Sequence, residues 1–165
     1  MTNRKNLHDY GLVLIFLSVL NVFMFASTVI AGFVDGSMQA ALATVEPEIL
    51  VAVKVVLAII GSIMGLLIVA DALIGIKALK VSANPTADKG YITVAKVFFV
   101  LTVIATIANL FGLFDNAADH IDAVLSFLNT ALSAVVYFYF IKSAQAVRND
   151  FLNGVKLQSG EVFGN

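Results

Sequence analysis

The sequence predicts an all-α integral membrane protein whose four transmembrane helices form a compact antiparallel bundle of two helical hairpins. Of the 165 residues, 60% are hydrophobic and only 13% are charged, and the mean hydropathy is +0.96. Soluble globular domains do not have this composition. Four apolar runs each reach the roughly 20 residues that a helix needs to cross about 30 Å of hydrocarbon. The charges between these runs alternate in sign along the chain, which predicts the orientation of the helices.

Basic residues mark three of the five polar segments, namely the N-terminus, the middle connection and the C-terminal tail: Arg4, Lys5, Lys77, Lys80, Lys89, Lys142, Arg148 and Lys156. The other two connections carry acids and no base: Asp35, Glu46, Glu48, Asp115, Asp119 and Asp122. Lysine and arginine are enriched on the cytoplasmic side of membrane proteins. We therefore expect both termini and the middle connection to be cytoplasmic. The short loops suggest a bacterial plasma membrane.

The first transmembrane helix is expected over residues 11–34. Arg4 and Lys5 precede it, and Ala41-Leu42-Ala43 follows it, a combination that is also found around signal-peptide cleavage sites. The apolar part of a signal peptide is about 7–15 residues long, and this run is longer. A retained membrane anchor is the better interpretation.

The second and third helices are expected over residues 49–78 and 91–114, with a cytoplasmic linker over 81–90. Asn84-Pro85 lies within this linker, and the residue before a proline is biased away from helix. The linker separates two hairpins of similar design. Gly32-Phe33-Val34-Asp35 and Gly112-Leu113-Phe114-Asp115 occupy matching places in them. Tandem duplication and convergence both explain this match.

The fourth transmembrane helix is expected over residues 121–146. We expect it to continue into the cytoplasm and to stop near Gly154, because glycine commonly follows a helix. Residues 155–165 are then a loose cytoplasmic tail, and residues 1–165 form a single domain. Tyr137-Phe138-Tyr139-Phe140 lies where the helix leaves the membrane. Aromatic residues concentrate at membrane interfaces, so an interfacial belt is favoured over a site for an aromatic substrate.

Small and polar residues recur on one face of each predicted span, where close packing and polar contacts hold membrane helices together. The sharpest packing signal is Gly61-x-x-x-Gly65, which would serve pairing within one chain or between chains. The polar members expected to face neighbouring helices are Ser18, Asn21, Asn109 and Asn129.

Two ionisable residues, Asp71 and Lys96, lie inside spans at matching depth from the cytoplasmic side. A charge in a span is costly and usually faces the bundle interior or water. We predict an Asp71–Lys96 pair. It would be either a static ion pair or part of a proton or ion path, and the alternative is that Lys96 extends alone to the headgroups.

Near the outer end of the second helix, Lys54 is an interfacial charge whose expected partners are Glu48, Asp115 or Asp119. Anion binding by Lys54 is the less favoured alternative. The cluster of Asp115, Asp119, His120 and Asp122 resembles a set of oxygen ligands for a divalent cation. It lacks the spacing of a calcium loop, and acids are favoured at a helix N-terminus by the helix dipole. No metal site is therefore predicted.

The chain contains no cysteine, which excludes disulfides and thiolate chemistry. It also shows no phosphate-binding glycine loop and no serine-nucleophile motif, so no catalytic residue, cofactor or nucleic-acid partner is expected. We expect a non-enzymatic scaffold, accessory subunit or regulator whose partners are the lipid bilayer and a membrane protein or further copies of the chain. The alternative is a small oligomeric channel or transporter with a path near Asp71 and Lys96. A lipid-modifying enzyme using the 115–122 acids is the weakest hypothesis.

Overall fold

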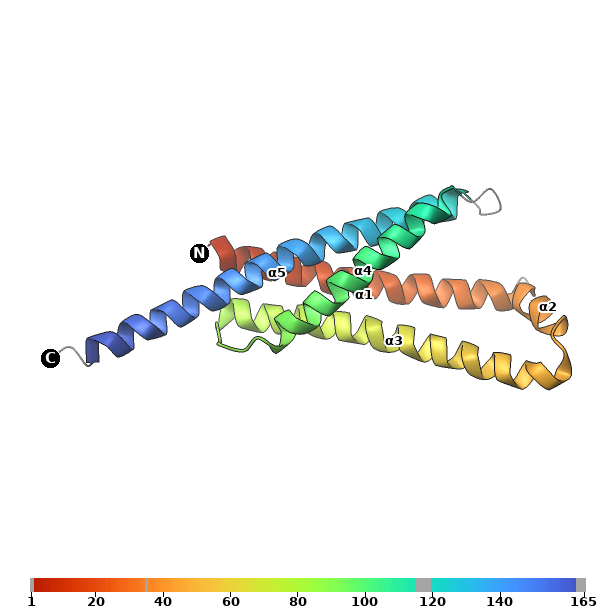
Figure 1. Cartoon of the computed structure of the whole chain (residues 1–165), viewed down its shortest axis with the longest axis horizontal. Helices are drawn as coiled ribbons and strands as arrows, with labels where there is room; N and C mark the ends of the chain where they lie inside the picture. The colour runs from red at the N-terminus through yellow and green to blue at the C-terminus, as the bar shows by residue number, and fades with distance from the viewer. Residues whose placement is uncertain (1, 35, 115–119, 163–165) are drawn as a thin grey trace. The chain divides into compact units, whose positions relative to one another are not determined.

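The computed structural model describes residues 2–34, 36–114 and 120–162, and all its regular structure in these ranges is helical (Figure 1). The helices are α1 (Thr2–Val34), α2 (Ser37–Ala43), α3 (Pro47–Ala83), α4 (Gly90–Gly112) and α5 (His120–Val162). All except α2 are long and apolar enough to cross a membrane. The prediction of an all-helical chain with four potential spans is confirmed.

The break between the two halves of the chain falls where the sequence predicted it. Helix α3 ends at Ala83, directly before Asn84-Pro85, and α4 begins at Gly90. The ring of Pro85 disfavours helical geometry at Asn84, which explains the position of this end. Helices α1 and α3 run beyond the predicted spans, to Thr2 and Ala83, and so include polar residues outside the apolar region.

The short helix α2 was not predicted. Residues 37–43 form the short helix α2. It follows Gly36, which has a φ of 73°. This left-handed conformation is one that glycine adopts without steric cost.

The expected end of the last helix near Gly154 is wrong, because α5 continues through it to Val162. Gly154 does not adopt the left-handed conformation that glycine has when it caps a helix. The expected loose tail at 155–165 is therefore helical as far as Val162.

The chain divides into two compact units, which we describe separately. The first unit comprises residues 1–14 and 74–165, and the second comprises residues 15–73.

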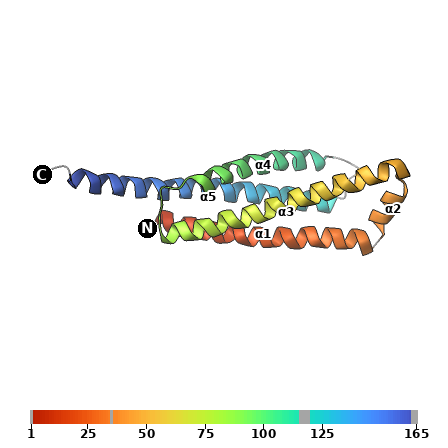
Figure 2. The ribbon, with the colours of Figure 1, turned by 90° about the horizontal axis from the view of Figure 1, so that it is seen from below.

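In the first unit, α4 and α5 form an antiparallel hairpin (Figures 1 and 2). Its contacts run in opposite directions along the two helices. The Tyr91 ring meets Phe140 at 6.2 Å between centroids, and the Phe98 ring meets Tyr137 at 6.0 Å. At the other end, Asn109 reaches α5. The hydrophobic core of this unit lies toward the linker and includes Leu7, Ala78, Val81, Ile92, Phe140 and Val147.

Helices α1 and α3 approach closely in the first unit, at Gly11. A Cβ atom added to Gly11 would lie 3.0 Å from the Cβ of Ala78 and 3.1 Å from the carbonyl oxygen of Gly75. Gly11 is buried. Here the absence of a side chain permits contact between the backbones.

In the second unit, α1 and α3 run side by side and are joined through α2 (Figures 1 and 2). Most large apolar side chains of this unit are exposed, among them Phe16, Phe23, Val51, Ile59 and Leu66. A soluble protein rarely leaves such a surface uncovered, whereas a bilayer would cover it.

Candidate functional site

The two charges predicted to pair inside the membrane have different environments. Asp71, in α3, is buried with 8% of its surface exposed, and Lys96, in α4, is exposed. On α4, Tyr91, Ile92 and Ala95 form the buried face, and Lys96 lies outside it. Asp71 belongs to the second unit and Lys96 to the first, so their pairing stays a prediction. The exposure of Lys96 fits a side chain that extends toward the headgroups.

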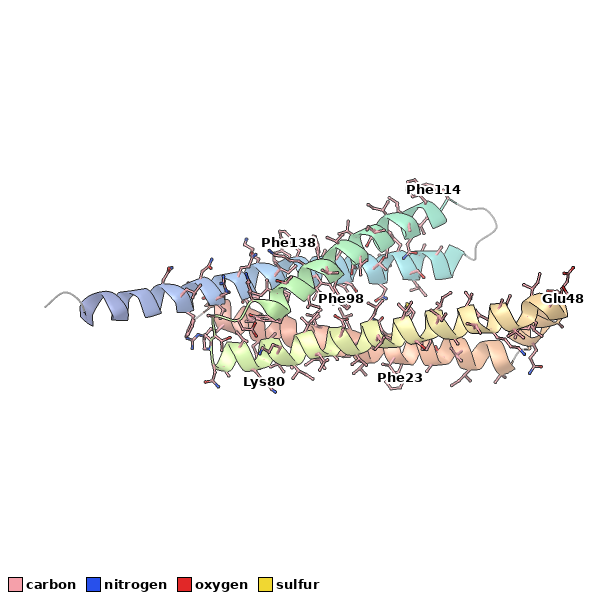
Figure 3. All side chains as sticks on the ribbon, turned by 60° about the horizontal axis from the view of Figure 1, so that its bottom comes forward. Phe23, Glu48, Lys80, Phe98, Phe114 and Phe138 are labelled. Carbon is pink, nitrogen blue, oxygen red and sulfur yellow. The ribbon has the colours of Figure 1, made fainter. Side chains whose placement is uncertain are left out.

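Lys54 is exposed on α3 and makes no ion pair with the residues that the structure describes. Its expected partner Glu48 is also exposed, in the first turn of α3, and is labelled in Figure 3. The other two expected partners, Asp115 and Asp119, lie outside the described residues.

The acidic cluster considered as a metal site falls largely outside the described residues. His120 and Asp122 lie in the first turn of α5, and Asp115 and Asp119 are not described. Within the described ranges, no three His, Cys, Asp or Glu side chains are grouped as they would be around a metal ion.

The predicted packing glycines on α3 are not in close contact. A Cβ atom added to Gly61 would meet only the Cζ of Phe25, at 3.8 Å, which is an ordinary van der Waals distance. One added to Gly65 would meet no described atom within 4 Å. The close glycine contact is instead at Gly11 and Gly75. Gly61 therefore faces Phe25 of α1, whereas the backbone at Gly65 has no described side chain packed against it.

The predicted polar packing residues lie in four places. Ser18 is buried on α1, and Asn21 is half-buried on the same helix. Asn109 is half-buried on α4, where its amide nitrogen donates to the Ser126 carbonyl and to the Thr130 hydroxyl, each at 3.3 Å. Asn129 is half-buried on α5. Asn109 thus joins α4 to α5, as a polar residue in a span is expected to do.

Two of the four aromatic residues at positions 137–140 of α5 lie in the hydrophobic core and not at a membrane interface. Tyr137 and Phe140 are buried against α4, whereas Phe138 and Tyr139 are exposed. Phe138, labelled in Figure 3, contacts Phe99 at 6.3 Å, and Tyr139 stacks on Tyr10 at 6.0 Å. The expectation of an interfacial belt therefore applies at most to Phe138 and Tyr139, because in a helix four consecutive side chains point in different directions.

A network of polar contacts holds the linker between α3 and α4. The Lys77 ammonium lies 3.1 Å from Oδ2 of Asp88. The other oxygen of Asp88 accepts the backbone N–H of Gly90 at 2.8 Å, at the start of α4. From α5, Nε of Arg148 donates to the Ala87 carbonyl at 3.0 Å. Three helices are thus connected through one short segment.

The electrostatics of this network favour the ionised form of Asp88. The hydrogen bond from the Gly90 N–H, and then the Lys77 ammonium, lower the pKa of Asp88 below its usual value. Each of these groups stabilises the carboxylate more than the neutral acid.

A shallow hollow of about 550 Å³ lies beside the linker, at the end of α3. Its walls combine two bases, two polar side chains and three apolar ones: Lys77, Lys80, Asn84, Thr86, Leu79, Val81 and Ala83. Lys80 is labelled in Figure 3 near the end of α3. All of these residues belong to the first unit.

The chain matches no known family model, no curated protein and no solved structure. Its function is therefore inferred from the geometry of its own residues.

Sequence reasoning named the linker and its bases and missed the contacts between them. One signal was present: aspartate two residues before a helix start often accepts the backbone N–H there, as Asp88 does from Gly90. The contact of Arg148 with Ala87 spans 61 residues. No local pattern predicts a contact over that separation.

Proposed function

We propose that this chain is a multi-pass membrane protein that acts as a non-enzymatic scaffold, accessory subunit or regulator by docking another membrane protein. The observation that carries the proposal is the space beside Gly65 in the Gly61-x-x-x-Gly65 motif of α3, where an added Cβ meets no described atom within 4 Å. Small residues let a neighbouring helix approach closely in lipid.

Three further features support this proposal. The four long helices have the length and hydropathy of membrane spans. The alternation of basic and acidic connections favours cytoplasmic termini and a cytoplasmic linker, as expected in a bacterial plasma membrane. The chain uses its other glycine contact, Gly11 against Gly75, to pack its own helices. Gly61 contacts Phe25 of α1, so the surface that remains for a partner is the one at Gly65.

Insertion and orientation are tested first, by cysteine labelling. Because the chain has no cysteine, single variants at exposed positions give an unambiguous signal. We expect Gln39→Cys, in α2, to react with an impermeant maleimide added to intact cells. Ala87→Cys, in the linker, should react only after the membrane is opened. The reverse pattern would overturn the orientation, and equal labelling of both would overturn insertion.

Docking is tested by placing a larger side chain at Gly65. Gly65→Leu should remove a stoichiometric partner from the complex extracted in mild detergent, as measured by native mass spectrometry. The matched control is Ala52→Leu, because Ala52 is also exposed on α3 and lies nine residues, or 2.5 turns, from Gly61, on the opposite side of the helix. Loss of the partner in both variants, or in neither, would contradict the assignment of this face.

A small oligomeric channel or transporter is the second candidate, and the burial of Asp71 within a potential span favours it. Buried ionisable groups in spans often mark ion or proton paths. For a conductor, Asp71→Asn should change flux in proteoliposomes and leave the thermal unfolding midpoint nearly unaltered. For a static pair, Asp71→Ala and Lys96→Ala should each destabilise the protein, and the double variant should recover part of the loss.

A further inference from the structure

We propose that the hollow at the end of α3 binds the phosphate headgroup of an anionic phospholipid of the cytoplasmic leaflet, with Lys80 as its principal ligand. This inference rests on the cytoplasmic orientation of the linker in the proposed function. It does not depend on the docking of a partner at Gly65.

The two lysines of the hollow differ in what they already contact. Lys77 is paired with Asp88 at 3.1 Å. Lys80 makes no ion pair within the described part of the chain, and it is exposed. A lysine of this kind is accessible to an external anion. Lys77 is held in place by Asp88, whose carboxylate offsets its charge.

The surroundings of the hollow carry a positive excess. Lys89 lies on the linker. Arg148 lies beside the linker and donates a hydrogen bond to the Ala87 carbonyl. Asp88 is the one acid of the linker, residues 84–89. The potential at this place therefore favours an anion over a cation or a zwitterion.

The polar and apolar walls match the two parts of a lipid. Asn84 and Thr86 supply an amide and a hydroxyl group that can donate hydrogen bonds to phosphate oxygens. Leu79, Val81 and Ala83 supply the apolar wall on the side of the helix. Lys80 lies three residues before the helix end, about 4.5 Å along the axis. It also lies two residues beyond the predicted span 49–78, and a lysine at the end of a span can extend into the headgroup region.

The bases near the linker are separated along the chain, at positions 77, 80, 89 and 148. The structure gathers them because α3 continues to Ala83 and the linker turns back over its last turn, where Asp88 meets Lys77. The lipid site is therefore a property of the folded linker.

The test is native mass spectrometry of the protein released from nanodiscs that contain equal amounts of phosphatidylglycerol and phosphatidylcholine. The wild type should retain phosphatidylglycerol preferentially. Lys80→Gln should lower this retention about fivefold, the factor expected for one base near an anionic surface. Lys80→Arg, which keeps the charge, should preserve it. Lys142→Gln, which removes an exposed base of α5 outside the hollow, should leave retention unchanged.

Three results would overturn the proposal. They are equal retention of both lipids by the wild type, unchanged retention in Lys80→Gln, and an equal loss in Lys142→Gln. A soluble source of phosphate is tested with Ala87→Cys carrying a fluorescent label, titrated with glycerol phosphate. Binding of glycerol phosphate as tight as that of phosphatidylglycerol would assign the site to a free phosphate compound. If cysteine labelling confirms the orientation and lipid preference is absent, only this inference fails.

Discussion

The Lys77 ammonium and the Asp88 carboxylate lie 3.1 Å apart and connect the end of α3 to the start of α4. Both side chains are exposed, and exposed ion pairs contribute little to stability. The pair instead positions the two helices, because Asp88 also accepts the Gly90 N–H and so fixes the first turn of α4.

Acid should release this connection. Because the pKa of Asp88 is lowered in the folded protein, its contribution is fully present above the unfolded value of about 3.9. The contribution is lost as the pH falls through the lower, folded value. We expect the thermal midpoint of Asp88→Asn in detergent to lie below that of the wild type at pH 6. The difference should shrink as the pH falls below 4, and a difference that is constant over this range would contradict the assignment.

Gly11 should tolerate no side chain. In Gly11→Ala, the new Cβ would lie 3.0 Å from the Ala78 Cβ and 3.1 Å from the Gly75 carbonyl oxygen. Neither atom can rotate away, so the two helices must shift apart by a few tenths of an ångström. Overpacking of this kind costs about 1–3 kcal/mol, measured as a lower unfolding free energy in micelles. Gly65→Ala, with open space around its Cβ, is the matched control and should show no loss. Equal effects of the two substitutions would contradict this packing.

Asn109 should contribute to the α4–α5 hairpin through its two hydrogen bonds. Asn109→Ala removes both the bond to the Ser126 carbonyl and the bond to the Thr130 hydroxyl. Interhelical hydrogen bonds of this type contribute about 0.6–2 kcal/mol in membranes. Thr106→Ala is the control, because the Thr106 hydroxyl bonds to the Thr102 carbonyl of its own helix. A loss in Thr106→Ala as large as in Asn109→Ala would argue against the interhelical role.

Tyr91→Phe should leave stability unchanged or raise it. Tyr91 is buried, and its hydroxyl makes no hydrogen bond with the described residues. Leaving a buried hydroxyl unsatisfied costs about 1–3 kcal/mol, which phenylalanine avoids while keeping the ring contact with Phe140. Tyr91→Ala, in contrast, should lower the unfolding midpoint strongly. A marked loss in Tyr91→Phe would show that the hydroxyl has a partner in the membrane, such as water or lipid.

The sequence was most informative where one local property decides the structure. The apolar runs predicted the four long helices, and Asn84-Pro85 predicted a break between α3 and α4. It was least informative where the outcome depends on contacts distant in the chain. Gly61 and Gly65 have the spacing of a packing motif, yet the close contact lies at Gly11, a residue that has no second glycine four positions away. Gly154 resembled a helix end, but its backbone stays helical, because composition alone does not fix the conformation of a glycine.

The central claim is that the surface of α3 at Gly65 docks a membrane protein. It is tested most directly by photo-cross-linking in the native membrane, with a small diazirine side chain placed at Gly65 or at Ile63. Ile63 is exposed and lies at nearly the same depth but more than half a turn around the helix. We predict that Gly65 gives a single protein adduct and that Ile63 gives lipid adducts. An adduct of Gly65 with a second copy of this chain would favour the oligomeric channel, and lipid adducts alone from both positions would contradict the claim.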